Sequence, residues 1–296
     1  MIATRKAFGN ALVRLGKTHP EMVVLDGDVK NSTYTEFFAK EFPDRFFELF
    51  IAEQTMAGVA VGFSARGFHP VVSTFACFLT RAADQFRMAA FSGANILVNG
   101  SHAGVSIGED GPSQMGLEDL AQFRAVHGST VFYPSDAVSS ERLTELALAQ
   151  KGIVYLRTTR PETPILYDAK ETFRIGGSKI FEPKKRPVVT VVAAGITLHE
   201  ALKAQQELPI RVIDCYSIKP IDTAALKKAA KETKAIIVVE DHYPEGGLGE
   251  AVQSVLASRV HHLAVRKTPR SGKSAQLLAY EEIDADAIIK TVRSIR

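Results

Sequence analysis

The sequence predicts an α/β protein of two domains, each built on a mainly parallel sheet flanked by helices. Short runs rich in β-branched residues alternate with helical patterns along most of the 296 residues. These runs are apolar on both faces, which is typical of parallel strands that helices cover on both sides. One stretch without this alternation separates two series of elements, and the chain is long enough for two cores of ordinary size.

The first series predicts an α/β domain over residues 1–165, and it begins with an amphipathic helix over residues 1–16. The strands predicted after it cover residues 22–28, 46–50, 69–75, 95–100, 129–135 and 153–158. The helices predicted between them cover residues 32–42, 55–67, 78–91 and 136–151. Because helices separate the strands, neighbouring strands are expected to run parallel.

Residues 166–186 are expected to form a linker. The surrounding stretch, residues 160–187, scatters proline, glycine and charge, which suits a linker with a small hairpin. Regular alternation then returns in a second domain, expected over residues 187–296. Its predicted strands cover residues 188–195, 210–217 and 235–241, and its predicted helices cover residues 197–208, 223–233 and 248–257.

Charge and cysteine content narrow the class of protein. The net charge is +3 with both signs interspersed, which indicates neither a nucleic-acid partner nor a membrane partner. No run of residues is long and apolar enough for a membrane-spanning helix. The two cysteines, Cys77 and Cys215, lie in unrelated contexts without metal-like spacing. This pattern predicts a protein of a reducing compartment, the cytoplasm, without disulfides.

Polar side chains gather in three loops that follow predicted strands, where ligand sites of open α/β sheets lie. Residues 25–33, LDGDVKNST, resemble the start of a thiamine diphosphate metal motif, but positions 51–56, where its asparagine would fall, read IAEQTM. A turn held by an Asx cap explains this loop more simply. The irregular, glycine-rich residues 99–123 are typical of a functional loop. Arg157 and Arg160 suit phosphate or carboxylate recognition, although paired arginines at a strand end are also ordinary surface charges.

Glu53 is the one carboxylate in the stretch LFIAEQTMAGVAVGF, residues 49–63, which is otherwise almost wholly apolar or small. Burying a carboxylate is costly unless a partner binds it, because desolvation disfavours the charged form. The pattern therefore predicts that Glu53 contacts a ligand, and the alternative is a glutamate at an exposed helix start.

Taken together, these segments closely resemble the C-terminal half of transketolase, with its pyrimidine-binding and C-terminal domains. The resemblance covers essentially the whole chain and includes LDGDVKNST, IAEQTMAGVAVG, GSHAGVSIGEDGPSQMGLEDLA, RTTRPE and VEDHYPEGGLGEAV. The segment GEDGPSQ favours transketolase over 1-deoxyxylulose-5-phosphate synthase and the β subunits of 2-oxo acid dehydrogenases, which share the Glu–Gln pair. The resemblance implies transfer of a two-carbon ketol unit from a ketose phosphate to an aldose phosphate by means of thiamine diphosphate.

The resemblance also implies roles for individual residues. It assigns cofactor binding to Glu53, Phe75, Phe78, Asp28 and Val29. Glu53 would be the catalytic carboxylate that hydrogen-bonds a pyrimidine ring nitrogen of thiamine diphosphate. Phe75 and Phe78 would pack against the faces of that ring. Arg81 stands where some relatives carry Tyr, so its role is open.

The resemblance assigns binding of the sugar substrates to a second set of residues. The resemblance assigns the terminal phosphate of the sugar to Arg5, Ser32, His102 and Arg160. Two arginines suit a phosphate dianion. Asp110 would hydrogen-bond the C2 hydroxyl of the donor. Gln114 stands where some relatives carry His, which leaves an acid–base role of this position open.

The resemblance further implies that the chain works with a partner. The chain begins at MIATRK, where the pyrimidine-binding domain itself begins, and it has no metal-binding motif of its own. We therefore expect a separately encoded N-terminal subunit that holds the cofactor's diphosphate and Mg²⁺, self-association of this chain to a dimer, and a 2:2 assembly. The alternatives are an enzyme similar to 1-deoxyxylulose-5-phosphate synthase and a non-catalytic module that retains half a site.

Overall fold

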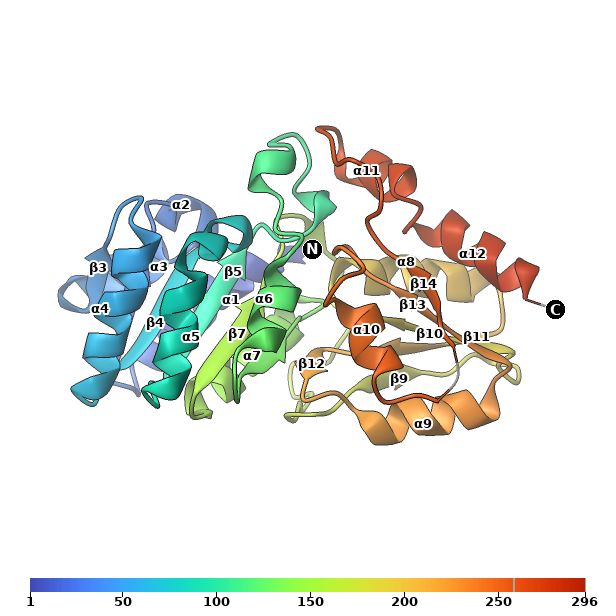
Figure 1. The fold of residues 1–296 in the computed structure, drawn as a ribbon, viewed down its shortest axis with the longest axis horizontal. Coiled ribbons are helices and arrows are strands. Elements are labelled where there is room, and N and C mark those ends of the chain that lie inside the picture. Colours follow the sequence, from blue (N-terminus) through green and yellow to red (C-terminus); the bar gives the residue numbers. More distant parts are fainter. Residues whose placement is uncertain (258, 296) are drawn as a thin grey trace.

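The computed structural model describes residues 1–257 and 259–295, which form two α/β domains side by side (Figure 1). Ser258 and Arg296, both inside the predicted second domain, lie outside the described residues. The predicted fold class is confirmed, because each domain is a mainly parallel sheet with helices on both faces. Within the described residues, no helix combines the length and apolar character that crossing a bilayer would require.

The first domain is built on a seven-stranded sheet in the order β12-β6-β7-β5-β4-β2-β3. Its parallel strands are β2 (Met22–Asp26), β3 (Phe46–Glu48), β4 (His69–Phe75), β5 (Ile96–Ser101), β6 (Thr130–Phe132) and β7 (Ile153–Arg157). The antiparallel edge strand β12 (Ser217–Lys219) comes from the chain that follows β11 (Ile210–Asp214), a strand of the second sheet. A separate two-stranded ladder pairs β1 (Ile2–Ala3) with β8 (Glu162–Thr163).

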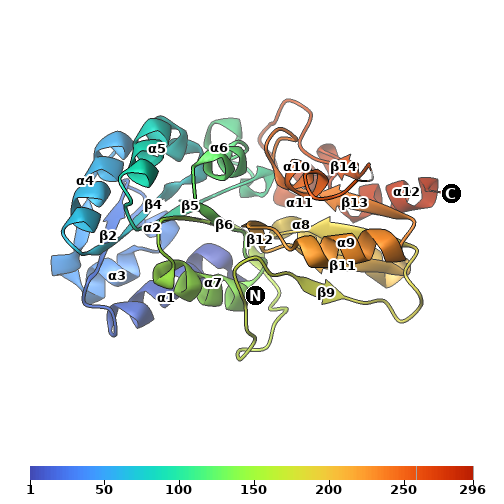
Figure 2. The same ribbon diagram turned by 60° about the horizontal axis from the view of Figure 1, so that its bottom comes forward.

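Helices cover both faces of this sheet (Figure 2). One face carries α1 (Thr4–Gly16), α3 (Glu36–Glu41) and α7 (Ala137–Ala149), and the other carries α4 (Glu53–Ala65), α5 (Ala83–Phe91) and α6 (Asp119–Ala125). Successive residues of β2 point into opposite cores: Val24 packs with the α1 side and Leu25 with the α4 side. This two-sided burial is why the strands are apolar along their whole length.

The second domain holds a five-stranded sheet in the order β14-β13-β10-β11-β9. Its strands are β9 (Lys179–Phe181), β10 (Val189–Ala193), β11 (Ile210–Asp214), β13 (Ala235–Val239) and β14 (His261–Leu263). All are parallel except β9, which runs antiparallel to β11. Its helices are α8 (Ile196–Glu207), α9 (Thr223–Glu232), α10 (Leu248–Gln253), α11 (Ser274–Tyr280) and α12 (Ala285–Ser294).

Three local expectations differ from the structure. The predicted helix over residues 32–42 is divided into α2 (Lys30–Thr33) and α3, because Tyr34 between them adopts the left-handed conformation with φ 63°. The small hairpin expected within residues 160–187 does not occur among the described residues. The strands of that stretch pair with distant partners instead, β8 with β1 and β9 with β11. A predicted helix over 78–91 begins as the 3₁₀ helix η2 (Ala76–Ala82).

A fully buried ion-pair network joins the two domains. Arg157, the last residue of β7, donates to Asp119 of α6 and to Asp241, which follows β13, with both shortest N···O distances at 2.7 Å. Tyr155 donates to Asp119 at 2.6 Å, and Tyr133 donates to Asp241 at 3.0 Å. Every polar group in this network is therefore paired without water, which is the condition for tolerating buried charge.

Replacing Arg157 should therefore destabilise the protein strongly. Arg157→Met leaves two buried carboxylates without their cation, and we expect the free energy of unfolding to fall by about 3–5 kcal/mol. Urea titration at one fixed protein concentration measures this change. Arg87→Met is the control, because Arg87 forms an exposed pair with Asp84 and should change stability by less than about 0.5 kcal/mol. A loss at Arg157 as small as the control's would contradict the role given to this network.

Candidate functional site

The residues singled out from the sequence gather where four parallel strands end. The strands β7, β5, β4 and β2 are neighbours in the sheet, so their carboxyl ends share one edge. Loops that leave this edge carry polar side chains, and α4 begins beside it. Such an edge is where open α/β sheets bind ligands.

Glu53 is the first residue of α4, and its side chain is only 3% exposed. It lines a cavity of about 410 Å³ together with Phe78, Arg81 and the Gly27–Val29 turn. Among the described residues, its carboxylate has one polar partner, the largely exposed guanidinium of Arg81 at 3.4 Å. The cavity thus presents a buried carboxylate with capacity to accept a hydrogen bond from a ligand.

Asp28 and Val29 also line this cavity, and their backbone amides donate hydrogen bonds to carboxylates. Asp28 adopts a left-handed φ of 65°, and its amide donates to Glu48 at 2.8 Å. The amide of Val29 donates to Asp26 at 2.7 Å, which is the local side-chain cap expected of this turn. Burial raises the pKa of Asp26 to about 6, although hydrogen bonds from Thr35, Val29 and Thr33 oppose that rise.

A stack of three rings leads from the cavity toward the end of β5. Phe78 lines the cavity and stacks on Phe75, with ring centroids 5.3 Å apart and planes 10° apart. Phe75 in turn stacks on His102, with centroids 3.8 Å apart. Phe75 is only 6% exposed, and Phe78, not Phe75, lines the cavity. The exposed apolar residues beside the cavity are Phe50 (66%) and Ile51 (70%).

Arg5, Ser32 and His102 meet at the far end of this stack. Arg5 donates from Nη1 to the Ser32 carbonyl at 2.6 Å and lies 3.4 Å from His102 Nε2. Its Nε is buried and has no hydrogen-bond partner among the described residues. His102 adopts a left-handed φ of 57°, which is uncommon for a residue other than glycine and is found at functional sites. Arg5 is therefore a cation with one hydrogen-bond donor, Nε, that no described residue uses.

Arg160 and Asp110 complete the cluster. The Arg160 guanidinium lies 3.0 Å from the Asp110 carboxylate and donates to the Ile107 carbonyl at 2.9 Å. Arg160 is close enough to Arg5 to lower the pKa of that guanidinium, in addition to the larger effect of burial. Gln114 lies half-buried in η4 (Pro112–Gln114) of the same loop.

His102 is held neutral by its surroundings. Burial lowers its pKa to about 3, and the charges of Arg5 and Arg160 act in the same direction. Its Nδ1 lies 2.9 Å from the Ser101 hydroxyl. A neutral imidazole can both donate and accept a hydrogen bond, which suits it to orient a ligand oxygen between the two cations.

Arg157 and Arg160, which the sequence analysis grouped as one possible anion-binding pair, lie in different environments. Arg157 is fully buried in the network with Asp119 and Asp241, so it does not bind a ligand at this edge, and only Arg160 lies in the cluster.

Reasoning from sequence also missed Thr4 and Thr159. Thr4 Oγ1 accepts from the Thr159 amide at 2.8 Å and lies 3.1 Å from the Thr159 hydroxyl. Because each threonine precedes one of the cluster arginines, this contact holds Arg5 and Arg160 together.

Comparison with known proteins places the chain among relatives of this architecture. The family model described as "Transketolase, pyrimidine binding domain" matches residues 1–165, and "Transketolase, C-terminal domain" matches residues 179–288. The transketolase of Homo sapiens is 53% identical over 305 aligned positions, which cover 99% of this chain and 49% of the human protein. The chain thus spans about half the length of the curated relatives it matches.

A solved structure described as "Split gene transketolase, inactive beta4 tetramer" matches with a TM-score of 0.88 and 36% identity. The match covers 99% of this chain and 98% of that chain. The transketolase of Campylobacter jejuni matches with a TM-score of 0.83 and covers 99% of this chain and 46% of that chain. At 21% identity, this second likeness shows the fold alone.

The neutral state of His102 predicts a pH dependence of stability. Its pKa of about 3 in the folded state lies below its ordinary value, so between these two values the unfolded chain binds the extra proton. Stability contributed by His102 is therefore present at pH 7 and is lost as the pH falls below about 6.5, by at most about 1.4 kcal/mol per pH unit. His102→Asn should reduce this slope in urea titrations between pH 6.5 and 4, whereas the exposed His261→Asn should not. Equal slopes for wild type and His102→Asn would refute the buried neutral imidazole.

Proposed function

The chain belongs to the transketolase family, to the half that contains the pyrimidine-binding and C-terminal domains, and we propose that it is the C-terminal subunit of a split transketolase. A solved relative described as a split-gene transketolase supports this proposal, because the two chains match over nearly their whole lengths. The assembled enzyme would transfer a two-carbon ketol unit from a ketose phosphate to an aldose phosphate. The observation that carries the proposal is the ring stack that joins the Glu53 cavity to the Arg5–Arg160 cluster.

The cavity fits the pyrimidine end of thiamine diphosphate. Glu53 supplies a buried carboxylate with acceptor capacity, and Phe78 supplies an aromatic face. When bound, thiamine diphosphate supplies the carbon nucleophile and the electron sink for carbon–carbon cleavage. Glu53 would hold a proton at a pyrimidine ring nitrogen through one hydrogen bond. Phe75 would stack on the Phe78 ring and hold it in place.

The same cavity does not fit a diphosphate. Two of its lining residues, Asp28 and Glu53, are carboxylates, and Arg81 is the one cation among the residues that line it. Repulsion between like charges would therefore disfavour a diphosphate here. We propose that the diphosphate and its Mg²⁺ are bound by an N-terminal subunit, which would cover the exposed Phe50 and Ile51 beside the cavity.

The arginine cluster fits the phosphate of a sugar substrate. Arg5 offers a buried donor without a partner, Arg160 lies close by, and neutral His102 can donate to a phosphate oxygen. The Ser32 hydroxyl would add a further donor beside Arg5. Asp110, which pairs with Arg160, and Gln114, on the same loop, would contact hydroxyls of the donor sugar.

Reconstitution tests the proposal. Purified alone, the chain should self-associate and show no ketol transfer, and adding an N-terminal transketolase subunit with thiamine diphosphate and Mg²⁺ should restore transfer. In the restored enzyme, Glu53→Gln should lower kcat by about 10²- to 10⁴-fold because the pyrimidine loses its hydrogen-bond partner. Circular dichroism and assembly size serve as controls for folding. Near-normal turnover of Glu53→Gln would rule out the role proposed for Glu53, and carbon dioxide release from pyruvate in place of ketol transfer would rule out the proposed reaction.

Arg160 provides a separate test of the phosphate cluster. Losing one charge-assisted contact costs roughly 1.5–3 kcal/mol, so Arg160→Ala should raise KM for a phosphorylated sugar by about 10- to 150-fold. KM for the unphosphorylated analogue should change little. Arg87→Ala, on the exposed face of α5, is the control and should change neither value. Equal losses for both kinds of sugar would place Arg160 away from the phosphate.

A further inference from the structure

A second cavity lies in the other domain, at the edge of its sheet. It has a volume of about 290 Å³ and lies between the chain that continues from the edge strand β14 and helix α12. Its polar lining includes Arg266, Lys267, Glu281, Glu282, Lys290 and Thr291. None of these residues lines the Glu53 cavity.

Glu281 is the distinctive feature of this cavity. The residue is only 5% exposed. Its Oε2 accepts hydrogen bonds from the backbone amides of Arg266 at 3.2 Å and Lys267 at 3.0 Å. Its Oε1 is buried and has no hydrogen-bond partner among the described residues. Leaving such an acceptor unsatisfied costs about 1–3 kcal/mol, so a ligand that donates a hydrogen bond to Oε1 would recover that free energy.

The cationic side chains around Glu281 favour a ligand that also carries an anionic group. Lys267 is occupied, because it pairs with Glu282 at 3.2 Å. Lys290 has no ion pair or hydrogen bond with any residue that the structure describes. The guanidinium of Arg266 makes only a long contact, 3.5 Å, with the His262 carbonyl. Two cations are therefore free to bind an anion beside a carboxylate that needs a donor.

We propose that this cavity binds a small phosphorylated polyol. A hydroxyl of the ligand donates to Glu281 Oε1, and its phosphate lies between Lys290 and Arg266. A dianionic phosphate matches two cations, and a hydroxyl donates the hydrogen bond that Glu281 Oε1 lacks. The cavity volume restricts the ligand to a small molecule. The site is independent of the proposed ketol transfer, because the two rest on different residues.

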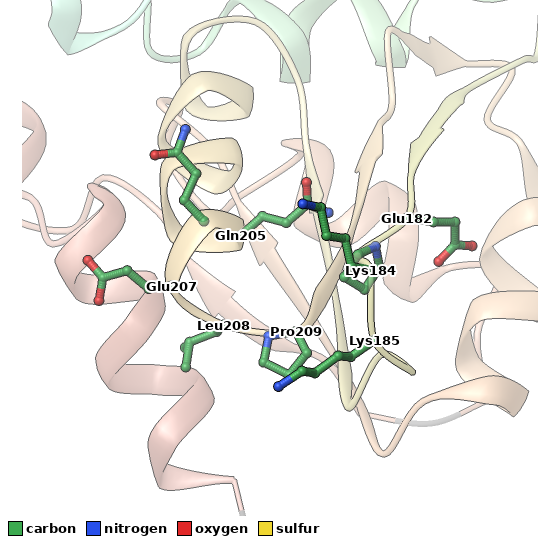
Figure 3. Close-up of a pocket in the computed structure, with 9 residues that line it drawn as sticks. Glu182, Lys184, Lys185, Gln205, Glu207, Leu208 and Pro209 are labelled. Atoms are coloured by element: carbon green, nitrogen blue, oxygen red, sulfur yellow. The ribbon is translucent and has the colours of Figure 1, made fainter.

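A larger cavity nearby lacks these features and provides a control. It has a volume of about 580 Å³ and lies between the end of α8 and the chain after β9 (Figure 3). Lys184 and Lys185 border it, but none of the buried, unpartnered polar atoms of the described residues belongs to its lining. Nothing there requires a ligand. Lys184→Gln therefore removes a lysine charge from the same domain without touching the proposed site.

Hydrogen–deuterium exchange on the full chain tests the proposal, with ribose 5-phosphate as the probe and with ribose and inorganic phosphate at equal concentrations. Ribose 5-phosphate should slow exchange in peptides covering residues 262–267 and 281–294, and the other two compounds should not. Lys290→Gln and Glu281→Gln should each raise the half-saturating concentration by about tenfold or more. Lys184→Gln should leave it unchanged. Lys290 is exposed on α12, so its substitution remains informative if Glu281→Gln fails to fold.

The outcomes separate this site from the arginine cluster. Binding at Arg5 and Arg160 would slow exchange in peptides covering residues 99–116 and 157–163 and would leave exchange in the peptides of α12 unchanged. Protection confined to those peptides, or protection nowhere, would overturn the second site. Equal protection by inorganic phosphate would also overturn it, because the hydroxyl bound by Glu281 would then be unnecessary. Loss of ketol transfer without loss of α12 protection would affect only the proposed reaction.

Discussion

The buried pairing of Arg157 with Asp119 and Asp241 joins the sheet of the first domain to the second domain. It fixes the end of β7 against the second domain, because Asp241 follows β13. The loop after β5 also lies on this network: Arg157 donates to the Gly116 carbonyl, and a Cβ at Gly104 would lie 1.8 Å from Asp241 Oδ2. The apolar core on the α4 side continues across the same junction into the second domain. The two domains therefore behave as one folded unit around this network.

This constraint explains how distant residues come to form one site. With Arg157 buried at the end of β7, the chain leaves the sheet at Thr158 and brings Thr159 against Thr4. The cluster of Arg5 and Arg160 is thus a consequence of strand order and of one hydroxyl contact, and burial together with the charges of this cluster keeps His102 neutral. The rings of Phe75 and Phe78 then connect this positive cluster to the carboxylate cavity. Opposite charges at the two ends of one ring stack suit a cofactor at one end and a phosphate at the other.

Much of the fold could be predicted from the sequence because its strands are buried on both faces. The strand 69–75 and the buried position of Glu53 follow directly from apolar patterning. Patterning could not show that Tyr34 breaks a helix or that β9 pairs with β11, because both depend on tertiary contacts. The same limit applies to Arg157: its ion pairs join residues 38 and 84 positions away, and no local signal identifies such partners. That Arg157 is buried while Arg160 lies in the site therefore depends on how β7 packs in the folded protein, which local sequence does not show.

We propose that this chain supplies the pyrimidine side of a cofactor site and that an N-terminal subunit supplies the diphosphate side. Calorimetric titration of the isolated chain with thiamine diphosphate and with thiamine, each with and without Mg²⁺, tests it most directly. The account predicts weak binding of both compounds with similar affinity, because two carboxylates and one exposed arginine do not attract a diphosphate. It predicts no effect of Mg²⁺, because the described residues hold no group of three or more His, Cys, Asp or Glu side chains that could bind a metal ion. It predicts a gain of about a hundredfold or more for thiamine diphosphate alone once an N-terminal subunit is added, equivalent to roughly 2.7 kcal/mol. Strong, Mg²⁺-dependent preference of the isolated chain for thiamine diphosphate would contradict the account.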